Sequence, residues 1–533
     1  MRRSPPEAGC LALGPGGQAP DDLRSSGRLS ARPALLAAVL AVAAAFSAPQ
    51  AAAQSGAAQR SWAVSPTAGL SQTVTNNYLL SDADPSFDAI TRATAGLAVT
   101  ANTGSVKGFL DYSLSGVGYL RHSDRNSIQN SLSSRLTAEI DPGRAGLDVA
   151  ANISRSAISA FGAQPNAGLG VQDNVTEIRT LRVAPRLLGP LGPNLRYNAN
   201  LALSATDAKD TSAGDVTAAT LGVHLEPVAR GRLSWVADAT AQRTDYKAGN
   251  SSSNERLTIG SHLTLDDIDT EVTGSAGVEY ATILTGARQR YSNWGVGLAW
   301  APNNRTRVSA KYDDRFFGPS RNLAVDHRTA LTSWHFSKSR SLTAPGAQAE
   351  TSGRGTAFDL LFTQFASALP DPTQRTEFVN AYLQSRGINT VASPDFLRSS
   401  ITIDEVDELA VAYRAVRSVA VLTLMNSKST RLGVQPGIAD DLSSSAAVYL
   451  KSIGLDLTHQ LTPDSSVGLQ LNRVRGSGTN LAQNTLQRRL GGRYSLRAYR
   501  TVDLAVGLSR TLYDKFQSSY GESAIVVTLG YRF

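Results

Sequence analysis

The side chains that could carry out chemistry are scattered along this chain. It contains no H-E-x-x-H motif and no pair of histidines four residues apart, although closely spaced ligands are typical of zinc sites. The sequence therefore predicts no metal site and no cofactor. It favours isolated positions on polar walls for the six histidines, which are His122, His224, His262, His327, His335 and His459.

One acidic cluster has the residue types that bind Ca²⁺ through carboxylate oxygens. It lies in the run LDDIDTE and lacks the Asp-x-Asp-x-Asp-Gly spacing of a calcium loop. Because the cluster falls where a short turn is expected, we interpret it as a solvated turn. Its members are Asp266, Asp267, Asp269 and Glu271.

Nucleophilic and nucleotide chemistry lack their usual motifs. The chain has no G-x-S-x-G elbow, no Walker-type phosphate loop and no dinucleotide fingerprint after a strand. A nucleophile beside His262, His327 or His335 would still allow an outer-membrane enzyme that acts on lipid or polysaccharide, so this alternative stays open. No catalytic residue is assigned, and we expect that the protein is not an enzyme.

Composition favours a polar-lined barrel over a soluble enzyme. Charged residues make up 18% of the 533 residues, whereas soluble proteins carry about a quarter. The 45 glycines suit tight turns, and small polar residues suit an aqueous lumen. The net charge of +8 is small and spread out, and no nucleic-acid partner is expected.

The N-terminal region has the features of an export signal. Arginines precede the apolar run from Pro33 to Phe46, and small residues at Ala51 and Ala53 follow it. This arrangement predicts a signal peptide over 1–53. The one cysteine, Cys10, lies within it, so no disulfide is expected in the exported chain.

Most of the remaining chain alternates apolar and polar residues. This is the pattern of β-strands, because successive side chains point to opposite faces of a sheet. Clear examples begin at Leu195, Arg232 and Val502. Short connectors alternate with longer polar ones, including loops predicted at Gly162 to Asn174 and Gly318 to Asn322, an asymmetry typical of outer-membrane barrels.

The two faces of these strands predict a lipid-facing side and a lumen-facing side. A sheet that crosses a membrane must close, because unpaired backbone groups are costly in lipid. The polar face is expected to line the lumen, where basic groups either attract an acidic polysaccharide or pair with acids. The lumen-lining candidates are Arg196, Asp238, Arg256, His262 and Arg532, with Arg473 added by neighbouring register.

The last ten residues, AIVVTLGYRF, form an alternating strand that ends in an aromatic residue. Such an ending resembles the signal that the outer-membrane barrel insertion machinery recognises. We therefore predict that this strand closes the barrel. Its apolar face consists of Ile525, Val527, Leu529, Tyr531 and Phe533.

The alternation breaks between Ser341 and Ser400. Apolar residues there recur with helical spacing, and the Pro370-Asp371-Pro372 segment predicts two short helices, the second ending near Gly387. The pair is expected to be a lumen plug or a membrane-surface cap. Its candidate packing residues are Leu360, Leu361, Phe365, Phe378 and Leu383.

The insert motif from Leu360 to Gly387, with the leader, the strands on both sides and the terminal GYRF, resembles an outer-membrane barrel family associated with the PEP-CTERM/exosortase system. The resemblance implies a conduit or scaffold in exopolysaccharide export or surface assembly. It implies outer-membrane lipid, the insertion machinery, and exopolysaccharide or its export proteins as partners. It supplies no catalytic residues.

These observations predict an all-β protein, a transmembrane antiparallel barrel with a short helical insert, located in the bacterial outer membrane. Fourteen strands are predicted before the insert and seven after it. Because single-chain barrels normally have an even number, about 20 strands are expected, within 18 to 22. The barrel would comprise residues 54–340 and 401–533, with the insert at 341–400. A general porin and a soluble β-sandwich array are the alternatives.

Overall fold

The structure is a computed structural model that describes residues 62–82, 84–164, 173–209, 211, 213–229, 231–247, 249–265, 269–284, 286–344, 356–370, 375–376, 378–379, 382–383, 395–433, 438–516 and 518–533. The predicted signal peptide with Cys10 lies outside these residues. So do Asp266, Asp267, Asp371, Pro372 and Gly387.

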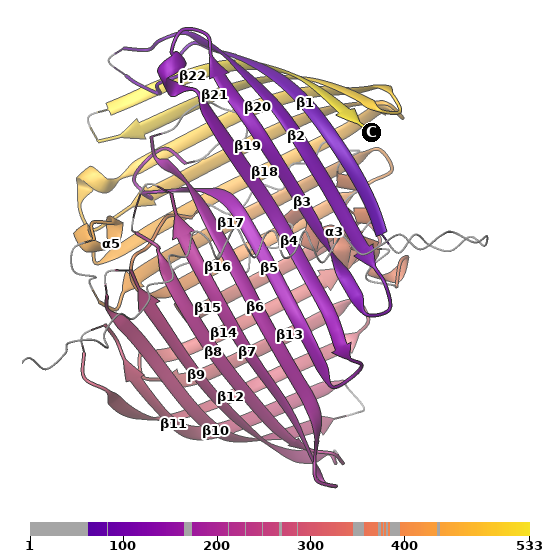
Figure 1. Cartoon of the computed structure of the whole chain (residues 1–533), viewed down its shortest axis with the longest axis vertical. Helices are drawn as coiled ribbons and strands as arrows, with labels where there is room; N and C mark the ends of the chain where they lie inside the picture. The colour runs from indigo at the N-terminus through magenta and orange to yellow at the C-terminus, as the bar shows by residue number, and fades with distance from the viewer. Residues whose placement is uncertain are drawn as a thin grey trace, which may run out of the picture. The chain divides into compact units, whose positions relative to one another are not determined.

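Twenty-two strands form one antiparallel sheet, and the first fifteen precede the insert (Figure 1). They are β1 (Trp62–Thr75), β2 (Asp88–Asn102), β3 (Val106–Tyr119), β4 (Ser127–Asp141), β5 (Ala145–Ala157), β6 (Val175–Leu191), β7 (Leu195–Ala208), β8 (Val216–Pro227), β9 (Leu233–Tyr246), β10 (Ser251–Leu265), β11 (Thr270–Thr282), β12 (Gln289–Asn303), β13 (Thr306–Arg315), β14 (Gly318–Arg328) and β15 (Thr332–Thr343).

Seven strands follow the insert. They are β16 (Thr402–Arg414), β17 (Ser418–Arg431), β18 (Ala447–Thr462), β19 (Ser465–Ser477), β20 (Thr485–Tyr499), β21 (Val502–Lys515) and β22 (Ser518–Arg532). The helical elements are short. They are helix α3 (Thr356–Gln364), helix α5 (Asp441–Ser444) and the 3-10 turns η1 (Ser123–Arg125), η3 (Phe365–Ser367) and η4 (Leu481–Gln483).

The sheet closes because the last strand pairs with the first. β22 runs antiparallel to β1, from Thr67 opposite Arg532 to Thr75 opposite Ala524. The Thr75 hydroxyl also donates to the Glu522 carboxylate across this seam, at 2.9 Å. The observed 22 strands lie at the upper end of the predicted range.

The strand count before the insert exceeds the prediction by one. The loop predicted at Gly318 to Asn322 is wrong, because these residues begin β14, which pairs with β13 from Gly318 opposite Arg315. Only Phe316 and Phe317 separate the two strands. Gly318 has a φ of +87°, a left-handed conformation that glycine adopts without steric cost, so the Gly-Pro pair marks a tight turn here.

The two ends of the barrel differ in the length of their connections. At one end, which we call the short-turn end, residues 103–105, 142–144 and 304–305 join neighbouring strands. β1 also begins and β22 also finishes at this end. At the other, the long-loop end, the connections include 76–87, 158–174, 432–446 and the insert at 344–401.

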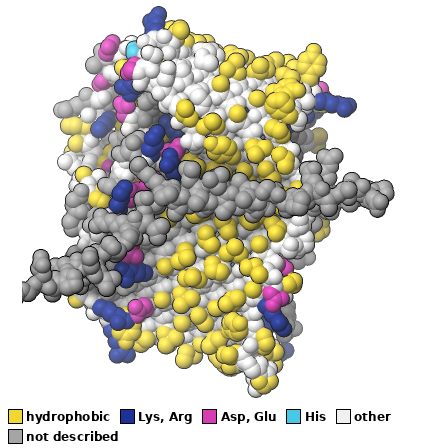
Figure 2. All heavy atoms as spheres, viewed as in Figure 1, with side chains coloured by type: hydrophobic (Ala, Val, Ile, Leu, Met, Phe, Trp, Pro, Cys, Tyr) yellow, Lys and Arg dark blue, Asp and Glu magenta, His cyan; other side chains and the backbone are white. Residues whose placement is uncertain are grey.

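Alternation along each strand separates an outward and an inward face. On β10, Leu257 and Ile259 are 52% and 65% exposed, whereas Thr258 between them is 6% exposed. On β16, Ala410 and Ala412 are completely buried against the insert, so their face points inward. Figure 2 shows apolar side chains gathered over the outer surface of the strands. No helix in the described ranges is long and apolar enough to cross a membrane.

Candidate functional site: the lumen and its insert

The five predicted lumen-lining residues all lie on the inward face, by register and alternation. Each contacts a group of opposite charge or an imidazole on another strand, which favours a wall of paired charges over a free basic surface. The contacts are Arg196 with Glu226 at 2.8 Å, Asp238 with His224 at 2.7 Å, Arg256 with Asp313 at 2.9 Å, Arg532 with Asp503 at 2.6 Å, and His262 with Glu271.

The prediction for Arg473 is wrong. It lies on the face of β19 that carries Leu469 and Leu471, which are 40% and 39% exposed, so it points outward. Val474, its neighbour in sequence, is the inward residue and is 5% exposed. Alternation separates two faces, but neighbouring register was needed to decide which one is inward, and the register assumed from sequence was incorrect here.

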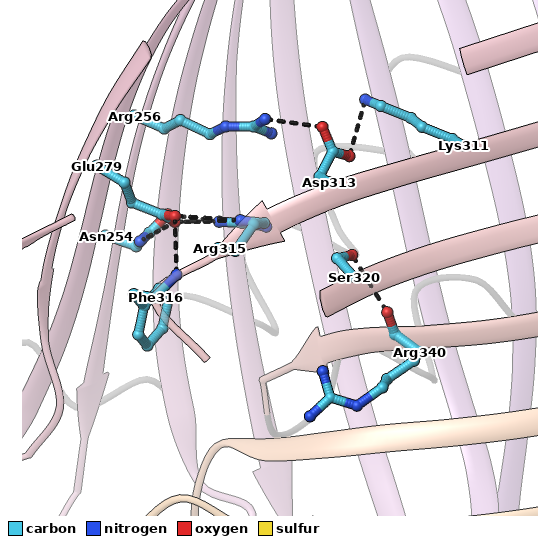
Figure 3. Close-up of polar contacts among 9 residues, drawn as sticks. All are labelled: Asn254, Arg256, Glu279, Lys311, Asp313, Arg315, Phe316, Ser320 and Arg340. Carbon is cyan, nitrogen blue, oxygen red and sulfur yellow. Dashed lines mark hydrogen bonds and ion pairs between the residues drawn. The ribbon is translucent and has the colours of Figure 1, made fainter. Parts of the chain in front are cut away.

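A network on the inner wall holds β10, β11 and β13 together (Figure 3). Glu279 is completely buried and accepts from Asn254 Nδ2 at 2.7 Å and from Arg315 Nε at 3.2 Å. Arg315 Nη2 also donates to Asn254 Oδ1 at 3.1 Å. A buried carboxylate is stable only when paired and hydrogen-bonded. The three side chains therefore form one rigid polar unit.

A second ion cluster lies beside this network on the same wall (Figure 3). Asp313 is contacted by Arg256 at 2.9 Å and by Lys311 Nζ at 3.4 Å. Gly295 on β12 makes the room for it, because a Cβ there would lie 2.3 Å from Asp313 Oδ1. At this point of the wall, two basic groups contact one acid. The Asp313 carboxylate fits because residue 295 has no side chain.

Among the described residues, the inward histidines contact carboxylates and not hydroxyl groups. His335 points inward and contacts Asp326 at 2.8 Å, whereas His327 pairs in register with the outward Trp334. Hydroxyl–imidazole contacts occur at Thr306 with His327, 3.0 Å, and at Ser418 with His459, 2.8 Å. Both pairs face outward, and no carboxylate contacts either imidazole in the described part of the chain. That the protein is not an enzyme stays a prediction.

Two members of the acidic cluster, Asp269 and Glu271, lie in the described part of the chain. Glu271 contacts His262, and Asp269 occupies the turn before β11 with a φ of 43°. No group of three or more potential metal ligands is found within the described ranges. The solvated-turn interpretation is wrong for Glu271, because this residue lies in β11 and contacts His262 across the sheet. For Asp266 and Asp267, which lie outside the described residues, it stays a prediction.

The first part of the insert packs inside the barrel near the short-turn end. Leu360 and Leu361 of α3, together with Phe365, are buried against β16 and β17, where Ala410, Ala412, Val419 and Val421 form an apolar seat. Since Ala410 and Ala412 precede the end of β16 by four and two residues, the helix lies deep in the lumen. The alanines leave the space that the helix fills.

Two contacts with arginines of the wall accompany the apolar packing of this helix. Arg328 donates to the Thr363 carbonyl at 3.0 Å, and the Arg414 guanidinium lies 4.5 Å from the centre of the Phe365 ring. Residues 375–376, 378–379 and 382–383 are also helical, as the second predicted helix requires. Leu383 is buried in the same cluster, whereas Phe378 is 43% exposed and contacts the Phe365 ring.

The last part of the insert lies at the long-loop end and joins a cap over the lumen. Phe396 packs with Ala160, Phe161 and Leu442 in one apolar cluster. Asp441 accepts from the Ser159 hydroxyl at 2.7 Å and from the Ala160 amide at 2.6 Å. The cap therefore connects the β5–β6 loop, the insert and the β17–β18 loop.

The cap also contacts β20 and β21. Tyr513 on β21 donates to the Phe161 carbonyl at 3.0 Å, and the Gln164 amide donates to Gln487 on β20 at 2.8 Å. Burial raises the pKa of Asp441. The cap thus crosses from β5 to β20 and β21, with a carboxylate at its centre.

Arg398 anchors the returning chain. It is buried and contacts Asp404 at 2.5 Å and Asp395 at 2.9 Å. Burial alone would disfavour its charge, but the two carboxylates outweigh burial and raise the pKa of Arg398. The insert is therefore fixed at its C-terminal end by ion pairs, and at its helical end mainly by apolar packing.

Comparison with known proteins identifies no family. No protein-family model and no curated protein matches the chain. Among solved structures, the chain is similar to the FrpB iron transporter from Neisseria meningitidis (F5-1 variant), with 10% identity, 88% of this chain and 82% of that chain covered, and a TM-score of 0.45.

Two other solved structures show a similar degree of likeness. The ferric preacinetobactin receptor BauA from Acinetobacter baumannii has 11% identity, 88% and 80% coverage and a TM-score of 0.44. OccK1 (OpdK) from Pseudomonas aeruginosa has 10% identity, 88% and 99% coverage and a TM-score of 0.34. Because all three scores lie below 0.5, no property of these proteins is carried over to this chain.

The wall network makes a prediction about stability. Glu279→Ala leaves the Arg315 guanidinium without its carboxylate, and breaking a buried pair typically costs about 3 kcal/mol of unfolding free energy. Glu255→Ala is the matched control, because Glu255 pairs with Arg288 at the surface, where an ion pair contributes about 1 kcal/mol or less. Urea unfolding in detergent micelles measures both. Equal losses in the two variants would contradict the role assigned to the network.

Proposed function

We propose that this chain is an integral outer-membrane β-barrel that forms a conduit closed by its own insert. The closed sheet supports the membrane placement, because the pairing of β22 with Thr67 to Thr75 of β1 removes the open edge that would be costly in lipid. The apolar outward face and the unequal length of the connections at the two ends support it as well. By the same rule, the long-loop end faces the cell exterior and the short-turn end faces the periplasm.

The observation that carries the conduit proposal is the path of the insert. It leaves β15 at the long-loop end, packs α3 on the inner wall near the short-turn end, and returns to the long-loop end before β16. A barrel of 22 strands encloses a lumen that needs a plug to be closed. The insert occupies that lumen at the level of Ala410 and Ala412.

The way the insert is held favours a movable closure. Its helical part lies on an apolar seat, next to the hydrogen bond from Arg328 to the Thr363 carbonyl and the contact of Arg414 with the Phe365 ring. Its C-terminal end is held by the buried Arg398 ion pairs. Release of α3 from the seat would therefore open the lumen while the barrel and the anchor at Arg398 stay intact.

The class of cargo is a separate expectation. The resemblance of the insert motif implies exopolysaccharide or its export proteins as partners, and paired charges along the wall suit a polar polymer. A clean deletion of the gene should reduce the amount of polymer on the cell surface. Normal polymer output would remove this cargo and leave a conduit for another polar solute.

A general porin is the second candidate, and the paired wall charges favour it because they select weakly. The two candidates differ in the conductance expected of the unmodified protein. An open porin conducts ions without any change to the insert, whereas a plugged conduit does not.

Membrane placement is tested by moving one charge between the two faces of the closing strand. Val527 of β22 points outward, and its neighbour Thr528 points inward. Val527→Arg should lower the unfolding free energy in lipid bilayers by about 2–4 kcal/mol, as for arginine near the bilayer centre, while Thr528→Arg should have a much smaller effect. Equal effects would argue against lipid on the outward face.

The closure is tested by conductance in planar bilayers. Leu361 is completely buried against the seat, whereas Asp359 on the same helix is exposed. Leu361→Arg places a charge in the apolar cluster, so it should release α3 and raise the single-channel conductance at least several-fold over the wild type. Asp359→Arg adds arginine without entering the seat and should stay closed. A wild type that already conducts as much as Leu361→Arg would favour the general porin.

A further inference from the structure

Five basic residues gather on the outward face of β18 to β21, toward the long-loop end. Cross-strand register places them side by side, with Lys451 opposite Arg475 and Arg473 opposite Arg488. Arg510 lies one step further along the barrel, opposite Leu490. We call this group the basic cluster. Its members are Lys451, Arg473, Arg475, Arg488 and Arg510.

The basic cluster directly borders the apolar band of the barrel. Leu471 precedes Arg473 by two residues on the same face and pairs with Leu490, and Leu508 precedes Arg510 in the same way and pairs with Ile525. The cluster therefore lies at the depth where the hydrocarbon region gives way to headgroups, at the end that faces the exterior in the proposed orientation.

The positive charges of the cluster are poorly compensated by the protein. Arg488 contacts Asp514 at 2.6 Å, and Arg510 donates to the Ser523 hydroxyl at 2.7 Å. Within the described ranges no carboxylate contacts Lys451, Arg473 or Arg475. Like charges directly opposite on neighbouring strands destabilise a sheet, so the Arg473–Arg488 pair calls for an external anion.

Neighbouring strands show the contrasting, compensated arrangement. On β15 to β17, Lys338 contacts Asp407 at 3.0 Å, while Arg340 and Lys428 contact Glu405 at 3.7 and 3.6 Å. Arg321 also contacts Glu405, at 3.9 Å, so four bases share two acids here and each of the four has a carboxylate within 4.0 Å. The lack of such acids on β18 to β20 is therefore a local feature and not a property of the whole outer rim.

We propose that the basic cluster binds the phosphates of a multiply phosphorylated glycolipid headgroup in the outer leaflet. Four adjacent strands carry the cluster over a width of about 14 Å, given about 4.8 Å between strands, which exceeds the size of one phosphate. Guanidinium groups bind phosphate oxygens with two parallel hydrogen bonds, and the apolar band below the cluster accommodates acyl chains. This inference rests on the proposed outer-membrane placement.

The test uses the purified full-length barrel in dodecyl maltoside micelles and lipid A with two phosphates as the probe. Native mass spectrometry measures the fraction of barrel with bound lipid A across a titration. The Arg473→Gln/Arg488→Gln double variant should bind about thirtyfold more weakly than the wild type, since each basic group near a lipid surface contributes about one factor of five. Lipid A without phosphates should bind the wild type and the double variant equally weakly.

The matched control removes two outward charges elsewhere. Arg243 on β9 and Arg290 on β12 are exposed on the outer face and lie outside the cluster, so Arg243→Gln/Arg290→Gln should bind lipid A as the wild type does. Heat-modifiable gel migration shows that each variant is folded. Equal loss in both double variants would overturn the proposal, because it would show non-specific charge attraction.

Competition separates a lipid from a free anion. Inorganic phosphate at the concentration of lipid A should not displace it, and displacement would overturn the lipid as the occupant. Lipid A binding in micelles does not depend on conduction. If the conduit proposal is wrong, Leu361→Arg leaves the conductance unchanged while lipid A still binds. A failed lipid site leaves the conductance result unaffected.

Discussion

Backbone hydrogen bonding is the constraint on which the rest of this structure depends. An N–H or C=O group without a partner costs several kcal/mol in hydrocarbon. A sheet can therefore face lipid only when its last strand pairs with its first. The pairing of β22 with β1 provides that closure. Once the sheet is closed, each strand has one face for lipid and one for the lumen, and the alternation of the sequence follows from this division.

The inward face carries many polar and charged groups that need partners. Along the wall, acids and bases form ion pairs, as in the buried Glu279–Arg315 unit and the contact of Arg256 with Asp313. At two levels the solution is apolar contact instead. The α3 seat near the short-turn end and the cap around Phe396 near the long-loop end both bury side chains that a water-filled channel would expose.

The parts of this architecture that follow a local pattern could be predicted from sequence. Period two revealed strands and the closing segment, and helical spacing revealed the insert with Leu360, Leu361 and Phe365 as its packing residues. Parts that depend on distant residues could not. Asp441 and Ser159 are 282 residues apart, and no local signal indicates that they meet in the cap. The Glu279 network likewise depends on the register of β10 to β13, because β12 separates Glu279 on β11 from Arg315 on β13.

The errors at Gly318 and Arg473 have distinct physical origins. The polar run from Gly318 to Asn322 predicts one of the longer loops, whereas these residues begin β14 after a tight turn at Phe316 and Phe317. The prediction for Arg473 rests on neighbouring register, and that register is off by one face on β19. In a barrel that spans a membrane, however, outward charge is equally stable where the apolar band ends, and only register reveals on which side such a residue lies.

The central claim is that one face of each strand meets lipid while the other meets the lumen of a closed sheet. Nitroxide scanning along β22 tests it most directly, because the chain has one native cysteine, Cys10, in the predicted signal peptide. Labels placed singly from Ile525 to Tyr531 in reconstituted protein should alternate: 525, 527, 529 and 531 collide with oxygen dissolved in lipid, and 526, 528 and 530 do not. Uniform access of a water-soluble nickel complex to both sets would contradict the account.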